Sequence, residues 1–186
     1  MPKAQTPAPP RRPRTPLMEI DPAGLDDEAL KEGLANAVFA QANLANLRGH
    51  RTMVERVVFR GCRMTGIQFA ESTLRDVLVE DCRVDLASMR FSRLERVVFR
   101  RCLLQDLELN EAQLTSVVFD ECDLSGADFA FARFARSEIR GCTLDRVTSV
   151  ERLRGVAMPW PDIVGFAGSL AAAIGIAVID EEDDEQ

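Results

Sequence analysis

Apolar side chains recur every five residues through the middle of the chain. From Ala37 to Arg146 the sequence divides without insertion into 22 five-residue units, which begin AVFAQ, ANLAN and end SEIRG, CTLDR. The third position of each unit is Phe, Leu, Met, Val or Ile with one exception, and the first position is small or of modest size. An amphipathic helix repeats every 3.6 residues and a strand every 2, so neither element by itself explains the pattern.

A square coil with one unit on each side does explain it, if positions one and three turn inward. Five cysteines recur at a fixed interval of four units: Cys62, Cys82, Cys102, Cys122 and Cys142. A fixed period of this length indicates a solenoid, in which each coil buries its apolar side chains against its neighbours. At the strand spacing of roughly 4.8 Å between coils, the repeats predict a rod roughly 26 Å long.

The units resemble those of the pentapeptide-repeat family, whose consensus is A-(D/N)-L-x-x. The clearest matches are the segments 42–44 (ANL) and 127–129 (ADF), and the resemblance covers residues 37–146. It implies an all-β fold, namely a right-handed quadrilateral parallel β-helix. The spacing alone predicts the coil but not its hand.

Residues at equivalent positions of successive coils are predicted to stack as inward columns. One column is Phe59, Val79, Phe99, Phe119 and Ile139, and the next is Leu44, Met64, Val84, Leu104, Leu124 and Leu144. The cysteines form a further inward column and point the same way, so we interpret them as small buried hydrophobes rather than as metal ligands or disulfides. Gly49 is the exception at position three, and we expect Leu47 or Met53 to fill the gap that it leaves.

Two outward columns predict surface features on the same side of the rod. The charged column, Arg60, Glu80, Arg100, Asp120 and Arg140, alternates in sign and predicts a ladder of ion pairs between coils. Beside it lies an apolar stripe, our candidate partner-contact surface, of Val58, Leu78, Val98 and Val118. Exposed stripes of this kind mark contact surfaces. The alternative is that segment 17–36 or the C-terminal segment folds over the stripe.

The ends of a solenoid need caps, because they leave unpaired strand edges and an open core. We expect a C-terminal helical cap in residues 147–179, with one helix that begins near Pro161 and stops at Gly175. Its apolar face provides a candidate cap or dimer surface of Trp160, Ile163, Phe166, Leu170 and Ile174. That known family members often pair through their C-terminal ends is implied by the resemblance alone. Residues 17–36 are the expected N-terminal cap or lead-in, with a short helix in 25–36.

The two terminal segments are strongly charged and are predicted to be disordered. Residues 1–16 are rich in Pro and Arg, and residues 180–186 (DEEDDEQ) are acidic. The net charge of −7 comes mainly from this tail, since residues 37–146 hold 16 acidic residues and 16 Arg. The basic N-terminus has no apolar segment behind it, so we expect no secretory signal and a cytoplasmic protein. No apolar run is long enough to span a membrane.

Nothing in the sequence predicts an enzyme. We expect no catalytic residue, no cofactor and no metal, since there is no Ser-His-Asp set, no Gly-rich phosphate loop and no convergent ligand set. The only histidine, His50, is expected on the surface. Direct nucleic-acid binding is not expected either, because the arginines of the repeats alternate with acids.

Two functions remain as hypotheses. The first is a non-enzymatic protein-interaction or scaffold rod, with an unidentified protein partner or a homodimer through the C-terminal end. The second is implied by the resemblance, whose best-studied members bind DNA gyrase or topoisomerase by imitating DNA and protect it from quinolones. Duplex DNA of this rod's length carries about 15 negative charges, whereas the repeats sum to zero. Acidic patches around Asp81, Asp85, Asp106, Glu121 and Asp123 are the remaining basis for the second hypothesis.

Overall fold

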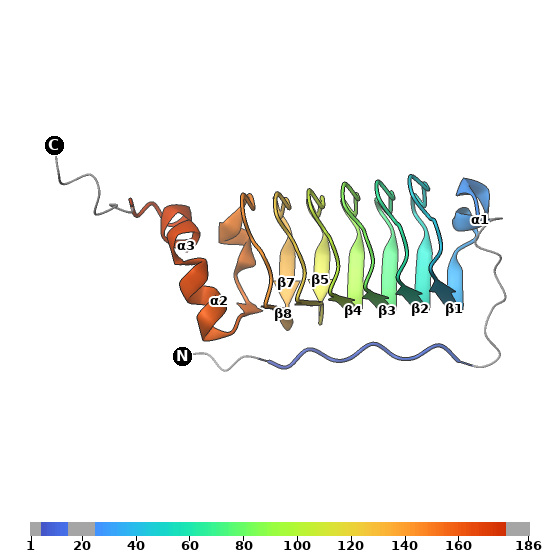
Figure 1. The fold of residues 1–186 in the computed structure, drawn as a ribbon, viewed down its shortest axis with the longest axis horizontal. Coiled ribbons are helices and arrows are strands. Elements are labelled where there is room, and N and C mark those ends of the chain that lie inside the picture. The colour runs from blue at the N-terminus through green and yellow to red at the C-terminus, as the bar shows by residue number, and fades with distance from the viewer. Residues whose placement is uncertain (1–4, 15–24, 178–186) are drawn as a thin grey trace.

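The computed structural model describes residues 5–14 and 25–177. The predicted acidic tail, 180–186, and residues 17–24 of the predicted lead-in lie outside these residues. The described chain forms a row of stacked coils between a short helix, α1, at one end and two helices, α2 and α3, at the other (Figure 1). It is a parallel β-solenoid with short C-terminal helices, as the five-residue period and the family resemblance predicted.

Parallel strands hold the coils together, and from β1 to β8 each paired residue meets its equivalent one coil later. The strands are β1 (Leu34–Ala40), β2 (Met53–Arg60), β3 (Thr73–Glu80), β4 (Arg93–Arg100), β5 (Gln113–Thr115), β6 (Val118–Asp120), β7 (Arg133–Ala135), β8 (Ser137–Arg140) and β9 (Val156–Ala157). Val58 pairs with Leu78, Leu78 with Val98, and Val98 with Val118. The rod begins at Leu34, slightly before the first unit counted from the sequence.

The two other sides of each coil are joined by isolated parallel bridges rather than by continuous strands. Asn43, Arg63, Arg83 and Leu103 are successive members of one such row. The coil turns at the fifth position of the units, where the backbone adopts a left-handed conformation, as at Asn46 (φ 61°) and Leu86 (φ 56°). A bend of this hand at the end of each unit turns an extended chain through the four corners of one coil.

The inward columns form one continuous core. The Phe, Leu, Met and Val residues at position three from Phe39 to Phe129 are almost completely buried. Two phenylalanine pairs stack across neighbouring coils, each with ring centroids 5.2 Å apart: Phe39 with Phe59, and Phe99 with Phe119. Val79 lies between these pairs in the same column and interrupts the stack. The predicted core columns are therefore confirmed.

The gap at Gly49 is filled from the next coil, and our expectation for this position was wrong. A Cβ atom on Gly49 would lie 2.7 Å from Cε1 of Phe69, whose ring occupies the space. Phe69 is buried, whereas Met53 is 47% exposed and Leu47 is only half-buried. The missing side chain at 49 thus accommodates a large aromatic ring at the equivalent position of the next coil.

Helix α1 (Asp27–Lys31) closes the first coil. The Ala29 N–H donates to the Asp26 carboxylate at 2.9 Å, which caps the helix N-terminus. Leu30 is buried over the open end of the core, and its carbonyl accepts a hydrogen bond from the Thr52 hydroxyl at 3.0 Å. Of the predicted range 25–36, α1 covers only 27–31, and strand β1 of the first coil begins at Leu34.

The C-terminal cap contains two short helices, not the single helix that we expected. A 3-10 turn, η2 (Val150–Leu153), and strand β9 lead to α2 (Trp160–Gly165) and α3 (Ala167–Ala173). The helices meet at Phe166, whose buried ring packs against the core end. Gly165, a poor helix former, directly precedes this junction. The predicted stop at Gly175 is confirmed, because its φ is 83° and its N–H donates to the Ala172 carbonyl.

Candidate interaction surfaces

The predicted charge ladder is confirmed over five coils. Arg60 donates to Glu80 at 3.0 Å, Arg100 approaches Glu80 at 3.6 Å and Asp120 at 3.0 Å, and Arg140 donates to Asp120 at 2.9 Å. Each carboxylate lies between two arginines, one from each adjacent coil. The ladder therefore neutralises its own charge and favours the correct stacking of coils.

We expect acid to weaken this ladder. Burial alone would raise the pKa of Glu80, but hydrogen bonds from Arg60 and Arg101 outweigh it and lower the pKa. The pKa of Asp120 is lowered by a hydrogen bond from Arg140, against burial and together with Arg100. A carboxyl group whose pKa is lower in the folded state stabilises it above the unfolded pKa, near pH 4, and loses that contribution as the pH falls.

The measurement is urea unfolding at a series of pH values from neutral to acid. The free energy of unfolding should begin to fall near pH 4. The double variant Glu80→Gln/Asp120→Asn should be less stable at neutral pH and should lose less stability on acidification. An equal acid loss in the variant and the wild-type chain would contradict a contribution from these two carboxylates.

A second charged cluster lies at the corner between the two halves of β3 and β4. Asp76 is buried and accepts two hydrogen bonds from the Arg96 guanidinium, at 2.6 and 3.0 Å. Arg96 also contacts Glu95, which accepts from Arg75 at 2.9 Å. Burial opposes ionisation of Asp76, but Arg96 and the backbone N–H of Arg11 hold its pKa below the ordinary value. Sequence reasoning missed this cluster, although its positions repeat once in every coil.

The predicted apolar stripe is not uniformly exposed. Val98 and Val118 are only 9% and 8% exposed, and Val58 and Leu78 are half-buried. Val38, which extends the same column toward α1, is 44% exposed. The exposed fraction of the stripe therefore falls from the first coil to the fifth, although its side chains are of nearly the same size throughout.

Residues 5–14 run along one side of the rod, alongside the coils from β1 to β8 (Figure 1). The Arg11 N–H donates to Asp76 at 3.0 Å, and the Arg14 N–H donates to the Asn36 side-chain oxygen at 3.4 Å. This part of the segment that we expected to be disordered therefore has defined partners on the rod. The signal in the sequence that could have indicated them is the regular spacing of Pro7, Pro10 and Pro13.

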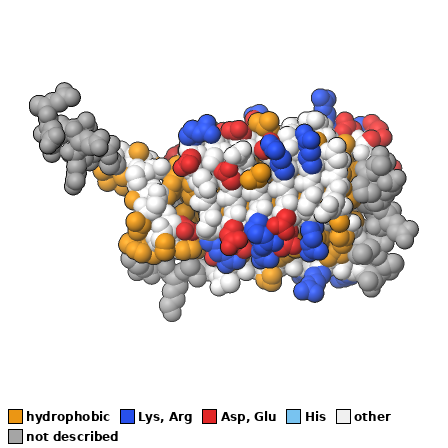
Figure 2. All heavy atoms as spheres, viewed as in Figure 1, with side chains coloured by type: hydrophobic (Ala, Val, Ile, Leu, Met, Phe, Trp, Pro, Cys, Tyr) orange, Lys and Arg blue, Asp and Glu red, His pale blue; other side chains and the backbone are white. Residues whose placement is uncertain are grey.

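The structure divides the candidate cap surface into a buried half and an exposed half. Phe166 is buried, while Ile163 and Leu170 are half-buried. Trp160 and Ile174 are 70% and 74% exposed, and two further apolar side chains, Val164 and Ile176, are 58% and 55% exposed. Figure 2 shows hydrophobic side chains gathered at this end of the rod, over the C-terminal cap.

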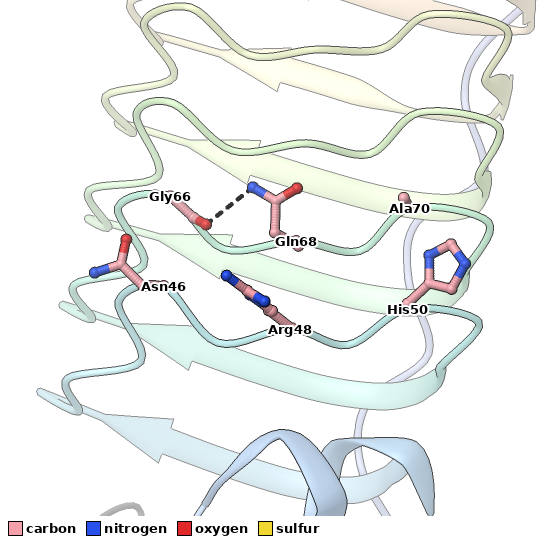
Figure 3. Close-up of a pocket in the computed structure, with 6 residues that line it drawn as sticks. All are labelled: Asn46, Arg48, His50, Gly66, Gln68 and Ala70. Carbon is pink, nitrogen blue, oxygen red and sulfur yellow. Dashed lines mark hydrogen bonds between the residues drawn. The ribbon is translucent and has the colours of Figure 1, made fainter.

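A shallow depression of about 450 Å³ lies on the outer wall of the first two coils (Figure 3). It is lined by His50, Asn46, Arg48, Gly66, Gln68 and Ala70. The Gln68 amide donates to the Gly66 carbonyl at 3.1 Å, and His50 Nε2 lies 3.3 Å from Glu71. Arg48 lies between Asn46 and Gln68 (Figure 3). The depression is open to solvent, and among the described residues Glu71 is the carboxylate that His50 contacts.

The cysteine column lies inside the rod, as predicted. Four of the five thiols are buried, Cys142 is half-buried, and all five are free. The Cys62 N–H donates to the sulfur of Cys82 at 3.2 Å, so successive thiols lie in line along the axis. The neighbouring Cys102 thiol and burial raise the pKa of Cys122 to about 12. Across residues 5–14 and 25–177, no three His, Cys, Asp or Glu side chains converge as metal ligands.

Three of the five acidic residues proposed as a DNA-like patch have side-chain partners. Asp81 accepts from Arg101 at 2.7 Å, and Asp85 accepts from Arg83 at 2.9 Å. Asp123 accepts from Gln105 and from Ser125. An arginine thus lies beside two of the five residues, whereas Asp106, Glu121 and Asp123 take part in no ion pair among the described residues.

These features define a repeat-built β-solenoid with a wall of paired charges and an apolar end. The chain belongs to the pentapeptide-repeat family. The family model described as a pentapeptide repeat region matches residues 33–109, and a model of eight copies of the pentapeptide repeat matches residues 108–146. No curated protein matches the chain.

Two solved structures illustrate the similarity of this chain to known proteins. A trypsin-treated variant of QnrB1, a plasmid-mediated fluoroquinolone resistance protein, is 19% identical, with 77% of this chain and 88% of that chain covered and a TM-score of 0.33. A pentapeptide repeat protein from the thylakoid lumen of Arabidopsis thaliana is 18% identical, with coverages of 52% and 64% and a TM-score of 0.35. At this level of similarity they assign neither a partner nor an activity to this chain.

The described helices are too short or too polar for a membrane span.

Proposed function

We propose that this protein is a non-enzymatic interaction rod that pairs with a second copy of itself through its C-terminal cap. The observation that carries the proposal is the exposed apolar set at the cap, Trp160, Val164, Ile174 and Ile176. Pentapeptide-repeat proteins are generally scaffold-type proteins without catalysis, which supports the non-enzymatic part. The five free thiols favour a reducing compartment, such as the cytoplasm.

The composition of the cap supports contact with another protein surface. Half of the cap's apolar side chains are already used to close the core, so the exposed half serves no purpose within the rod. Trp160 is the largest of them, and tryptophan at the centre of an interface contributes more binding energy than most residues. Exposed apolar residues elsewhere, such as Leu86 and Leu103, lie singly on walls that carry ion pairs.

A second copy is the partner that fits this geometry best. A cap at the end of a rod can meet the same cap of another rod about a two-fold axis, so that one surface serves both subunits. Neither α2 nor α3 contains a Lys or Arg, and the one acidic residue, Asp162, accepts a hydrogen bond from the Gly141 N–H at 2.6 Å. Two such surfaces therefore meet without repulsion between like charges.

Sedimentation equilibrium of the full chain tests the proposal. The wild-type chain should show a concentration-dependent dimer, and Trp160→Glu/Ile174→Glu should be monomeric, because charge is placed where apolar area is buried. Both side chains are more than two-thirds exposed, so the fold should persist, with an unchanged circular dichroism spectrum. Leu103→Glu, an exposed leucine on the wall, is the matched control and should dimerise normally. A wild-type chain that stays monomeric, or a dimer that the cap variant preserves, would refute the proposed pairing.

The alternative function, binding to DNA gyrase as a DNA mimic, is less well supported by the charges. A mimic needs a run of unneutralised acidic groups at the spacing of a phosphate backbone. Here Glu80, Asp120, Asp76, Asp81 and Asp85 each contact an arginine. The interaction rod therefore remains the function that we propose.

A further inference from the structure

The burial of residues 5–14 repeats every three residues. Pro7, Pro10 and Pro13 are half-buried, whereas the other seven residues of this arm are exposed. A strand would bury every second residue, but a polyproline II helix has three residues per turn and presents every third residue to one side. We therefore interpret the arm as a polyproline II segment whose proline edge faces the rod.

The repeat of the arm matches the repeat of the rod. The partners of Arg11 and Arg14 are Asp76 and Asn36, which occupy equivalent positions two coils apart. Two coils rise roughly 9.6 Å at the strand spacing, and three residues of polyproline II rise roughly 9.3 Å. Three arm residues thus advance along the axis as far as two coils do, so each turn of the arm meets an equivalent place on the rod.

The corner column of the rod has the matching two-coil alternation. An oxygen-bearing side chain alternates with arginine along Asn36, Arg56, Asp76, Arg96, Ser116 and Arg136. The arginines hold the oxygens in place: Arg56 donates to Asn36 at 3.0 Å, and Arg96 donates to Asp76. On the arm, the residue after each buried proline carries the N–H that faces the rod, as Arg11 and Arg14 show. Extended by one more turn, the same register would bring Ala8 toward Ser116, although no hydrogen bond joins these two residues.

The burial of the apolar stripe follows the course of the arm. Arg14 lies at the first coil and Arg11 at the third, so Pro7 to Pro10 reach the fourth and fifth coils. Those are the coils in which Val98 and Val118 are buried, whereas Val38 at the first coil is 44% exposed. The stripe is thus most deeply buried at the coils that Pro7 to Pro10 reach, although the arm also passes the exposed Val38.

We propose that this corner column and the apolar stripe form a binding track for polyproline II segments with proline at every third residue. Residues 5–14 are its built-in occupant, and a Pro-x-x-Pro-x-x-Pro segment of another protein binds by displacing them. Specificity comes from the match of three peptide residues to two coils, and from acceptors that recur at the same interval. This site is separate from the C-terminal cap, so its test is independent of the proposed pairing.

The first test compares two adjacent prolines in the full chain. Pro10 faces the rod and Pro9 faces solvent, so Pro10→Ala and Pro9→Ala remove similar backbone restriction on opposite sides of the arm. The exchange rate of the Arg11 amide proton, followed by NMR, should rise about tenfold in Pro10→Ala and change little in Pro9→Ala. Equal rates in the two variants would overturn the assigned face of the arm.

The second test supplies the arm as a separate molecule. The probe is a fluorescein-labelled peptide of residues 5–14, QTPAPPRRPR, and the receptor is the full chain with Pro7→Ala/Pro10→Ala/Pro13→Ala. A tethered arm competes at a high effective concentration, so the peptide should bind this variant at least about tenfold more tightly than it binds the wild-type chain. These substitutions lie outside the repeats and leave the core unchanged.

A permuted peptide separates proline spacing from charge. The sequence QPTPAPRPRR has the same composition and charge, but its prolines recur at every second residue. It should bind at least about tenfold more weakly than the native sequence. Equal binding of the two peptides would show that arginine attraction alone holds the arm, and no binding of the native peptide would show that the track does not accept a segment in trans. Either result would overturn the proposal.

Discussion

The Phe119→Ala variant is expected to lose about 3–5 kcal/mol of the free energy of unfolding. Phe119 is completely buried in the fifth coil, and its ring stacks on Phe99 with centroids 5.2 Å apart. Its removal leaves a cavity that the neighbouring coils cannot close, because their backbones are held at the strand spacing by parallel hydrogen bonds. The loss is measured by urea denaturation followed by circular dichroism.

The matched control for this prediction is Phe131→Ala. Phe131 is 63% exposed, and its ring lies 5.0 Å from the guanidinium carbon of Arg152. The same substitution there should cost less than about 1 kcal/mol, because it removes one exposed cation–π contact and little buried area. A loss of similar size at both positions would show that the stacked column does not dominate stability.

Gly49→Ala should have the second largest effect, a loss of about 1–3 kcal/mol. The added methyl group would lie 2.7 and 2.8 Å from two carbons of the buried Phe69 ring and 3.1 Å from the Thr52 hydroxyl oxygen. The ring has no free space to move into, since it is 1% exposed within the core. Thermal and urea denaturation of the full chain measure the change.

A second substitution tests the cause of this loss. Phe69→Leu alone should destabilise the chain by removing buried area, but in the presence of Gly49→Ala it should cost less, because it also relieves the contact. The double variant should therefore be more stable than the sum of the two single losses predicts. Strict additivity would mean that Gly49 and Phe69 are not in steric competition.

The solenoid could be predicted from the sequence because its contacts are periodic. A residue in one coil meets its equivalents in the coils on either side, so columns such as the cysteines and the charge ladder follow from spacing alone. The pairs Arg60 with Glu80 and Arg140 with Asp120 are formed as the alternation of sign predicted. The spacing does not say how much room one side chain of a column takes from its neighbour, which is why our prediction of the residue that fills the gap at Gly49 was wrong.

The cap helices show where periodic reasoning fails. An apolar spacing of three and four residues from Ile163 to Ile174 favours one helix, and the structure has two that meet at Phe166. The burial of Phe166 against the end of the core determines this junction. That end is a single surface with no repeat, so nothing in the spacing of the cap residues encodes its shape.

Spacing along the chain was enough to predict the coil, its period, the inward columns and the ion-pair ladder, because each depends on residues at a fixed interval along one axis. The covering of the outward surfaces became evident only in the folded chain. The arm of residues 5–14 meets Asn36 and Asp76 across 22 and 65 residues of sequence, and these separations are not multiples of the coil. The arm repeats every three residues and the rod every 20 residues, so a comparison of the two periods along the sequence does not show that they match. Their match exists only as a common rise in space.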